Sequence, residues 1–578
     1  MASSQLISTS KLRSTIWEHG SHIPLFFIVL IILAYLVLPP IFFTVETSLR
    51  EETGFEVGGL TLKNYASILS TPNTIDLLVN SVRFALGSAA VALILGTLLA
   101  WIVERTNTPL RGIVYITAFV SFAVPGIIKV VGWILLLGPR AGLINTWLMD
   151  LFGLKQAPFN IFSMSGMILT ESALWTPTVF LLMAVPFRSM DPSLEEASSI
   201  SGASRGKTFF NITLKLAIPS ILSVLLITFV RAIESFEIPA LVGIPGGITV
   251  LTTEIYLKIR GGGLLPSYGD ASAYAVLLIV LVSFLLYFYS RATRETYKFQ
   301  IITGKGFRPR IVDLGAWRYF AAALILLLPG LLVLPLAALL WASLLPYYAA
   351  PSVHMFSSLT LENYVSAFNN TNVQHSFRNS LFIGLISATA SVFLTAVTAW
   401  LVIRTKIRGR WLLDNLASLP LALPGIVMGL AVLRTYLTIP IPVYGTVWIL
   451  ILAFVARYLP YGMRYCYSGL LQIHQDLEDV SHASGAGWWT TFRKVVLPLL
   501  APALFGGWVF IFLICIRELS MAIILYGPRS QVIATTIWEL YENGQITELS
   551  AFSIVIVFIV VVIAIGCHRF SQRYGVHV

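Results

Sequence analysis

Charged residues are scarce in this sequence. Of its 578 residues, 11% are Asp, Glu, Lys or Arg and 57% are hydrophobic, whereas soluble domains carry about 25% charged residues. Cysteine is scarcer still: three residues occur, without metal-ligand spacing, so we interpret them as apolar packing residues. The composition therefore argues against a soluble fold and against one held by disulfides or a structural metal.

The sequence contains many long apolar runs. Runs of about 20 residues recur, the length that a helix needs to cross the ~30 Å hydrocarbon core of a bilayer. Ile23–Phe43 is the first, and Phe552–Gly566 closes the last. The first run is too long for a signal-peptide core and lacks a cleavage site, so we expect it to be retained. The sequence predicts an all-α, polytopic membrane protein.

The formal net charge of +11 does not indicate a nucleic-acid partner. The basic residues lie in short segments between the apolar runs, which is the pattern that sets membrane orientation. We therefore expect a lipid membrane as a partner and no nucleic acid.

The sequence contains an internal repeat. Asn80–Thr106 returns as Asn379–Thr405, an offset of 299 residues (379 − 80). Farther along, the offset falls to 283, as from Gly202 to Gly485 (485 − 202). The first copy thus has 16 extra residues (299 − 283), which fall around 139–163. We expect an interfacial segment or a re-entrant lip there, on the outer side.

Each copy supports six spans, so about 12 transmembrane helices are predicted in two parallel repeats. The expected spans are 23–48, 78–103, 112–137, 167–187, 212–233 and 271–291, then 317–344, 377–402, 411–436, 444–468, 496–516 and 549–569. We divide the chain into a first half (1–295), a basic linker (296–316) and a second half (317–578). An even number of spans per half puts the linker and both termini on the same side of the membrane, and the basic residues of the linker predict that this side is the cytoplasm.

The stretch GASRGKT (Gly202–Thr208) is close to a nucleotide-binding phosphate loop. It has three residues between its glycines instead of four, and no strand precedes it. The second copy has Trp489–Thr491 where the first has Gly206–Thr208. A nucleotide site would not be lost from one copy while its frame remained, so we reject a stand-alone ATPase.

Two equivalent loops, about 188–216 and 471–499, connect the fourth and fifth spans of each half. In the first loop, Glu195 and Glu196 favour the positive N-terminal end of a helix. About two turns later, Gly202 can take the left-handed conformation that ends a helix. A short helix, a glycine turn and a second helix are therefore predicted.

At these loops the chain resembles the permease subunits of bacterial binding-protein-dependent ABC importers. Their signature is Glu-Ala-Ala, three residues, Gly, nine residues and Ile-x-Leu-Pro. The first copy has Glu196-Ala197-Ser198, Gly202 and Ile212-Thr213-Leu214, with Lys215 at the proline position. The second copy has Asp479-Val480-Ser481, Gly485 and Val495-Val496-Leu497-Pro498.

The resemblance implies the type I importer permease fold, in a bacterial inner membrane. It implies a non-enzyme that binds two copies of a cytoplasmic ATPase and an extracytoplasmic substrate-binding protein. ATP and magnesium would belong to the ATPase, so neither a cofactor nor a metal site is expected in this chain. Each loop would be a coupling helix that docks in the ATPase, with these candidate residues: Glu195, Glu196, Ala197, Gly202, Glu478, Asp479, Gly485 and Pro498.

Ionisable residues at membrane depth are candidate pathway residues, because burying charge there is costly. They are Arg231, Glu234, Glu237, Arg517 and Glu518. Glu234 and Arg517 are equivalent at the 283 offset and can form a gate between the halves. The alternatives are structural ion pairs between helices, or residues at the outer interface.

The fusion of two permease halves in one chain resembles ferric-iron importers, so iron(III) is the expected substrate. The same machinery for thiamine, 2-aminoethylphosphonate or a polyamine is an alternative. A different class, the ion-coupled secondary transporter, can also have 12 helices in two parallel halves. The paired loops argue against that class.

Overall fold

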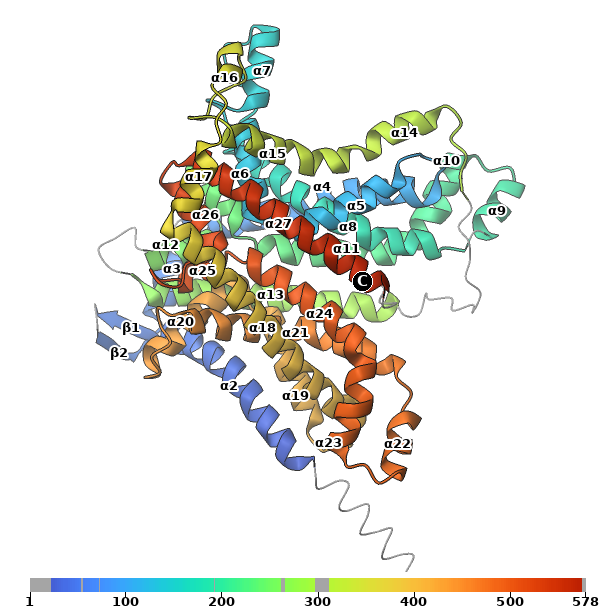
Figure 1. The fold of residues 1–578 in the computed structure, drawn as a ribbon, viewed down its shortest axis with the longest axis vertical. Coiled ribbons are helices and arrows are strands. Elements are labelled where there is room, and N and C mark those ends of the chain that lie inside the picture. The colour runs from blue at the N-terminus through green and yellow to red at the C-terminus, as the bar shows by residue number, and fades with distance from the viewer. Residues whose placement is uncertain are drawn as a thin grey trace, which may run out of the picture. The chain divides into compact units, whose positions relative to one another are not determined.

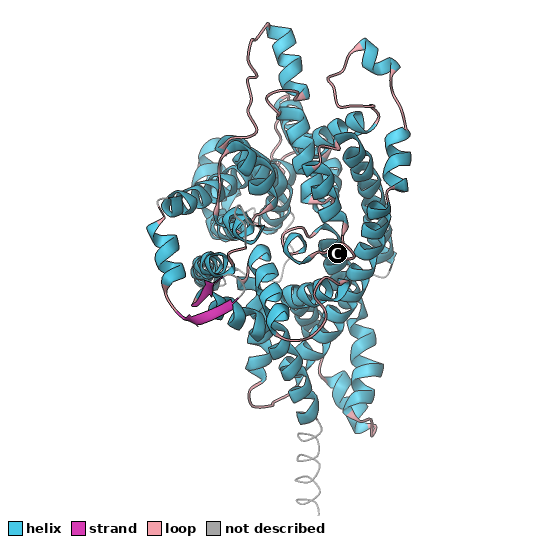
Figure 2. Ribbon diagram, turned by 90° about the vertical axis from the view of Figure 1, so that its left-hand side faces the viewer, coloured by secondary structure: helices cyan, strands magenta, loops and turns pink. Residues whose placement is uncertain are grey.

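The computed structural model describes residues 22–53, 56–71, 73–191, 193–260, 266–296 and 311–573. Within them, helices dominate, and one antiparallel pair of short strands is present, β1 (Arg50–Thr53) and β2 (Glu56–Leu60) (Figure 2). Most of the predicted basic linker and both chain ends lie outside the described residues. Their cytoplasmic placement stays a prediction.

The chain forms two compact units, and each combines pieces of both sequence halves. Unit A comprises Ser48–Gln374 and Ile533–Val562. Unit B comprises Met1–Thr47, His375–Val532 and Ile563–Val578. The first span of the first sequence half therefore belongs to unit B, and the first span of the second half belongs to unit A.

Unit A holds the larger set of helices (Figure 1). In chain order they are α3 (Lys63–Ser70), α4 (Asn73–Arg105), α5 (Arg111–Ala123), α6 (Gly126–Leu137), α7 (Leu143–Phe152), α8 (Met164–Ser189), α9 (Ser193–Ile200), α10 (Arg205–Thr208), α11 (Leu214–Ile233), α12 (Leu251–Arg260), α13 (Tyr268–Thr296), α14 (Trp317–Ile325), α15 (Leu327–Ser343), α16 (Val353–Ser357), α17 (Glu362–Asn369), α26 (Ile533–Glu542) and most of α27 (Ile546–Arg573).

Unit B is built around the middle spans of the second half. It holds α2 (Ile23–Ser48), α18 (Thr371–Arg404), α19 (Arg410–Ser418), α20 (Gly425–Thr438), α21 (Val447–Gln472), α22 (Asp476–Ala483), α23 (Trp488–Thr491), α24 (Leu497–Arg517) and α25 (Ala522–Leu525). Helices α21 and α24 pack along each other, and α20 packs on α25.

The core of unit A explains why a span of the second half belongs to it. Helices α4, α8 and α11 pack together, and Phe180, Met183 and Phe187 of α8 are fully buried among them. Ile325 and Leu328 of α14 and α15 join the same buried cluster. The first span of the second half thus packs into a core made by helices of the first half. The burial of its apolar side chains stabilises its place in unit A.

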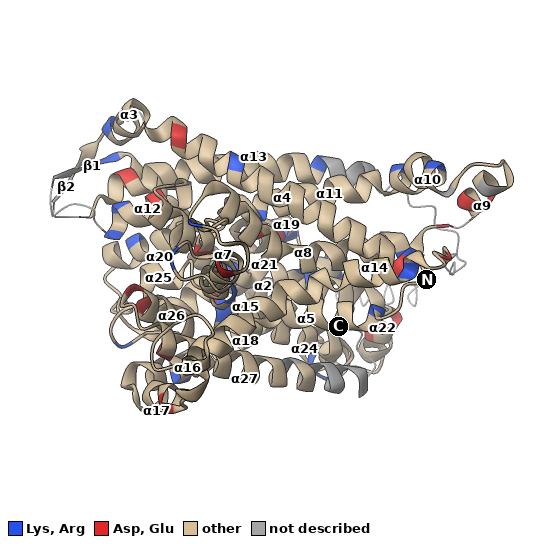
Figure 3. Cartoon of the chain, turned by 90° about the horizontal axis from the view of Figure 1, so that it is seen from above, with Lys and Arg blue, Asp and Glu red and all other residues tan. Residues whose placement is uncertain are grey.

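Ten described helices are long and apolar enough to cross a membrane. Figure 3 shows long stretches of these helices without a charged residue. The predicted polytopic all-α fold is confirmed, but the third span of each half differs from the prediction. Instead of continuous helices over 112–137 and 411–436, the structure has two bent pairs, α5–α6 at 107° and the pair Arg410–Ala422 with α20 at 112°.

Proline explains both bends. Pro125 and Pro424 immediately precede α6 and α20. A proline disfavours helical dihedrals in the residue before it, and Val124 and Leu423 are both extended, with ψ of 129° and 111°. A third bent pair, Pro239–Gly246 with α12 at 83°, was not predicted because its two parts are too short to read as a span.

The repeat also fixes the ends of the first spans. Asn64 of α3 donates to the carbonyl of Ser48 at 3.0 Å, and its equivalent, Asn363 of α17, donates to that of Ser343 at 2.9 Å. Each asparagine satisfies a carbonyl that a helix end leaves without an intrahelical partner. The repeated motifs around Leu62 and Leu361 therefore encode the same cap.

The extra segment of the first copy forms α7 and its flanking turns. Asn145 organises it, donating to the carbonyls of Leu137 and Phe159 at 3.0 and 2.8 Å. Trp147, Leu151 and Phe152 are exposed on α7. An interfacial or re-entrant placement stays a prediction.

Candidate functional site

The two loops between the fourth and fifth spans have the predicted local structure. In unit A, α9 is followed by Gly202, α10, a π-helical turn (Phe209–Thr213) and α11 (Figure 1). In unit B, α22 is followed by Gly485, α23, a π-helical turn (Phe492–Val496) and α24. The helix–glycine–helix prediction is confirmed, and the π-helical turns are an additional shared feature.

Both glycines adopt the left-handed conformation. Their φ angles are 79° for Gly202 and 85° for Gly485. After each glycine, an alanine N–H returns to the helix: Ala203 donates to the Ser198 carbonyl and Ala486 to the Ser481 carbonyl, both at 3.1 Å. This is the bond pattern of a glycine-terminated helix end.

In the loop of unit A, the acidic pair splits between two faces of α9. Glu195 is buried and forms an ion pair with Arg105, the last residue of α4 and itself fully buried. Its other oxygen accepts a hydrogen bond of 2.6 Å from the Thr213 hydroxyl. Glu196 is exposed. Glu195 therefore fastens α9 to the second span instead of facing a partner.

Unit B repeats this arrangement at equivalent positions. Glu478 is buried, and its carboxylate lies 2.7 Å from the guanidinium of Arg404, the last residue of α18. Trp400 donates to the same carboxylate at 3.1 Å. Arg404 also donates to the carbonyls of Leu470 and Ile473 at the end of α21, at 3.1 and 2.6 Å.

A contact between two hydroxyl groups also recurs in both loops. Hydroxyl groups of Ser198 and Thr208 lie 2.8 Å apart, and those of Ser481 and Thr491 lie 2.9 Å apart, so each short helix is tied to the one after it.

An aromatic pair joins the π-helical turn to the second span in both units. Trp101 meets Phe209 edge-on at 4.9 Å between ring centroids, and Trp400 meets Phe492 at 5.5 Å. The four aromatic positions obey the two repeat offsets. Both repeats therefore encode the same aromatic contact between the loop and the second span.

The opposite faces of α9 and α22 are exposed and mix apolar with acidic side chains. This outward face, which we call the docking face, comprises Leu194, Glu196, Ala197 and Ile200 on α9, and Leu477, Asp479, Val480 and Ala483 on α22. Pro498, the second residue of α24, is also exposed. The sequence could not tell these outward residues from the inward Glu195 and Glu478.

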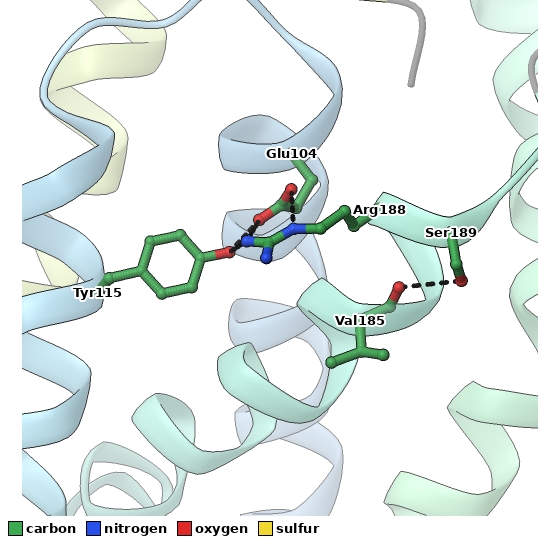
Figure 4. Close-up of polar contacts among 5 residues, drawn as sticks. All are labelled: Glu104, Tyr115, Val185, Arg188 and Ser189. Carbon is green, nitrogen blue, oxygen red and sulfur yellow. Dashed lines mark hydrogen bonds and ion pairs between the residues drawn. The ribbon is translucent and has the colours of Figure 1, made fainter. Parts of the chain in front are cut away.

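A further polar cluster lies beside the loop of unit A (Figure 4). Arg188, near the end of α8, donates to both carboxylate oxygens of Glu104 at 3.1 and 3.0 Å. Tyr115 of α5 donates to the same carboxylate and lies 2.8 Å from an Arg188 nitrogen. The cluster joins the ends of the second, third and fourth spans, and sequence analysis missed it because unit B has Ile403 in place of Glu104.

The pathway candidates lie near the opposite ends of the fifth spans from the loops. Arg231, in the last turn of α11, forms an ion pair with Glu234 at 3.1 Å. Arg517 is the last residue of α24. Glu518 accepts hydrogen bonds from the Tyr458 hydroxyl at 2.8 Å and the Met521 N–H at 3.2 Å. The pairing of Glu234 with Arg517 as a gate stays a prediction.

Two acidic candidates lie at the bends of the third spans. A Cβ added to Gly126 would come within 2.1 Å of a Glu237 carboxylate oxygen, and one added to Gly425 within 3.2 Å of Glu518 Oε1. Each carboxylate thus approaches the first residue of a helix, where backbone N–H groups lack intrahelical partners. Gly126 leaves room for Glu237 because it has no side chain.

A further buried acidic group, Glu171, is held by hydrogen bonds from its neighbours. Glu171 of α8 is 2% exposed and accepts hydrogen bonds from Trp175 and from the Ser235 hydroxyl, both at 2.9 Å. Among the described residues, no group of three or more His, Cys, Asp or Glu side chains is arranged to hold a metal ion.

Similar proteins are transport permeases. The ferric transport system permease protein FbpB of Actinobacillus pleuropneumoniae is 26% identical over 453 residues, which cover 78% of this chain but only 64% of that relative. The probable ABC transporter permease protein y4fN of Sinorhizobium fredii is 24% identical over 565 residues, covering 94% and 95%. A putative 2-aminoethylphosphonate permease, PhnV of Salmonella paratyphi A, is 28% identical over 246 residues, covering 42% and 90%.

The family model of the binding-protein-dependent transport system inner membrane component matches this chain twice, at residues 92–295 and 380–572. Each match contains one of the two loops. The chain is therefore a multi-pass membrane protein with two permease repeats, and it belongs to the binding-protein-dependent transport system inner membrane component family.

Proposed function

We propose that this chain is the transmembrane permease of an ATP-driven importer, in which α9 and α22 are coupling helices for two ATPase subunits. The observation that carries the proposal is the duplicated loop with its exposed docking face. Two separate helices of the same design, at equivalent places in two repeats, match a partner that binds twice. The loops and both termini would face the cytoplasm, and a binding protein would deliver the solute to the opposite side.

The docking face has the composition of a protein contact. Leu194 and Ile200 are 43% and 88% exposed on α9, and Leu477 and Val480 are 48% and 64% exposed on α22. Apolar side chains of this size gain stability when a partner covers them. The adjacent carboxylates would give the contact charge complementarity with a basic groove.

We propose iron(III) as the transported solute. This proposal is supported by the similarity of most of this chain to a ferric transport system permease protein. The similarity of one half to a putative 2-aminoethylphosphonate permease keeps that solute as the second candidate.

Uptake is measured in cells that lack this chain, with and without the restored gene. The measurement tests both the energy source of transport and the identity of the solute. Labelled iron(III), 2-aminoethylphosphonate, thiamine and spermidine are offered separately. We expect uptake of iron(III) to depend on the gene and to stop on ATP depletion, but not on collapse of the ion gradients. Gene-dependent uptake of another solute would replace iron(III), and loss of uptake on gradient collapse alone would favour a secondary transporter.

A further inference from the structure

We propose that the ion pairs Arg105–Glu195 and Arg404–Glu478 are latches that fasten each coupling helix to the end of its second span. Through them, a displacement of α9 or α22 moves α4 or α18 instead of being absorbed by the loop. The inference rests on the proposed function, because the displacement would come from the ATPases. It assigns positioning roles to both arginines.

The latch occurs twice, at equivalent positions of the two repeats. Arg105 and Arg404 are related by the offset of 299, and Glu195 and Glu478 by the offset of 283. The two ion pairs form in different units, so the contact is made twice independently. Neighbouring polar positions diverged: Glu104 corresponds to Ile403 and Thr213 to Val496.

All four latch side chains are largely buried. The side chain of Arg105 is 0% exposed and that of Glu195 10%, while those of Arg404 and Glu478 are 12% and 6% exposed. Surface ion pairs hold little, because water and salt screen them. Removing one partner of a buried pair is far more disruptive, because it leaves an uncompensated charge.

Each coupling helix depends on tertiary contacts to hold its position. Helices α9 and α22 are 8 residues long each, too short to be stable without tertiary contacts. Separated from each helix end by one residue, a left-handed glycine, Gly202 or Gly485, turns the chain. The aromatic and hydroxyl contacts described above hold the return segment, but the latch is the ion pair that joins the coupling helix itself to a span.

The docking face and the latch use different residues of each coupling helix. In both helices, two consecutive acidic residues differ in burial: Glu195 and Glu478 are buried, whereas Glu196 and Asp479 are exposed. Neutralising the inward residues should therefore leave the docking face unchanged. This separation makes the latch testable apart from ATPase binding.

The test compares two near-isosteric variants. The latch variant carries Glu195→Gln and Glu478→Gln, and the docking control carries Glu196→Gln and Asp479→Asn. Spin labels are placed at Pro109→Cys and Arg408→Cys, exposed equivalent sites just beyond α4 and α18, after the native cysteines are replaced. The chain is purified with its co-expressed ATPase, and the inter-label distance is measured with and without ATP and vanadate.

With the unsubstituted loops, we expect ATP and vanadate to shift the inter-label distance. The latch variant should retain its ATPase and its ATP hydrolysis but lose the shift. The docking control should lose ATPase instead. A third variant, with Arg105→Glu, Glu195→Arg and unchanged Arg404 and Glu478, keeps an ion pair at both places and should shift as the unsubstituted protein does.

The contrary outcomes are distinct. A latch variant that binds ATPase and shifts like the unsubstituted protein overturns the latch. If the latch variant fails to accumulate in the membrane, the variant with Arg105→Glu and Glu195→Arg is measured instead. If that variant binds ATPase but shows no shift, the latch is overturned as well. If the unsubstituted chain recovers no ATPase, the proposed function has failed, and with it the source of the displacement.

Discussion

Replacing Gly202 and Gly485 together by proline is expected to abolish transport while the protein still inserts into the membrane. Both glycines hold φ near +80°, at 79° and 85°, whereas proline fixes φ near −65°. The turn after each coupling helix would have to open, which would move α9 and α22 out of register with the ATPase. The spans lie outside the altered turns, so immunoblots of the membrane fraction should show the wild-type amount, with uptake near background.

Alanine substitutions separate this backbone effect from crowding. A Cβ at either glycine would meet nothing within 4 Å, so Gly→Ala costs only the left-handed conformation, about 1–2 kcal/mol per site, and should lower uptake partly. Gly206→Ala and Gly487→Ala are the matched controls, because these neighbours have open space and no positive φ. Normal uptake in the double proline variant would show that the turns do not position the coupling helices.

Gly132→Leu is expected to destabilise the protein strongly. Gly132 lies on α6 where α15 crosses it, and a Cβ there would come within 2.5 Å of the Pro335 carbonyl oxygen and 2.7 Å of its Cβ. Backbone at that distance cannot rotate away, so the helices must separate. Overpacking of this kind costs about 3 kcal/mol.

Thermal unfolding in detergent measures the effect of Gly132→Leu. The size-matched control is Gly330→Leu on α15, where an added Cβ has open space within 4 Å. We expect a clear fall in Tm for the first variant and little change for the second. Equal Tm values would contradict the packing of the second half's first span on α6.

Much of this architecture could be predicted because the chain encodes it twice. The offsets of 299 and 283 located equivalent spans, and the shared Gly202 and Gly485 predicted the helix–turn–helix loops correctly. The latch arginines carried the same signal: Arg105 and Arg404 are both the penultimate residue of the repeated motif around the second span. They were passed over because a basic residue at a span end also fits membrane orientation.

Other features depend on contacts that no local pattern specifies. Burial of Ile325 among first-half helices joins residues far apart in sequence, so the exchange of first spans between units was not predictable. Glu195 and Glu196 are adjacent and chemically alike, and only the position of Arg105 distinguishes inward from outward. The bends at Pro125 and Pro424 had a local signal, but the apolar runs continued through them and indicated unbroken spans.

If α9 and α22 are both coupling helices, one chain offers two equivalent docking sites to an ATPase. Native mass spectrometry of the complex, purified in mild detergent from its own membranes, counts the subunits directly. We predict two ATPase copies per chain, and loss of both in the variant with Gly202→Pro and Gly485→Pro. A single bound ATPase, or none, would contradict the account.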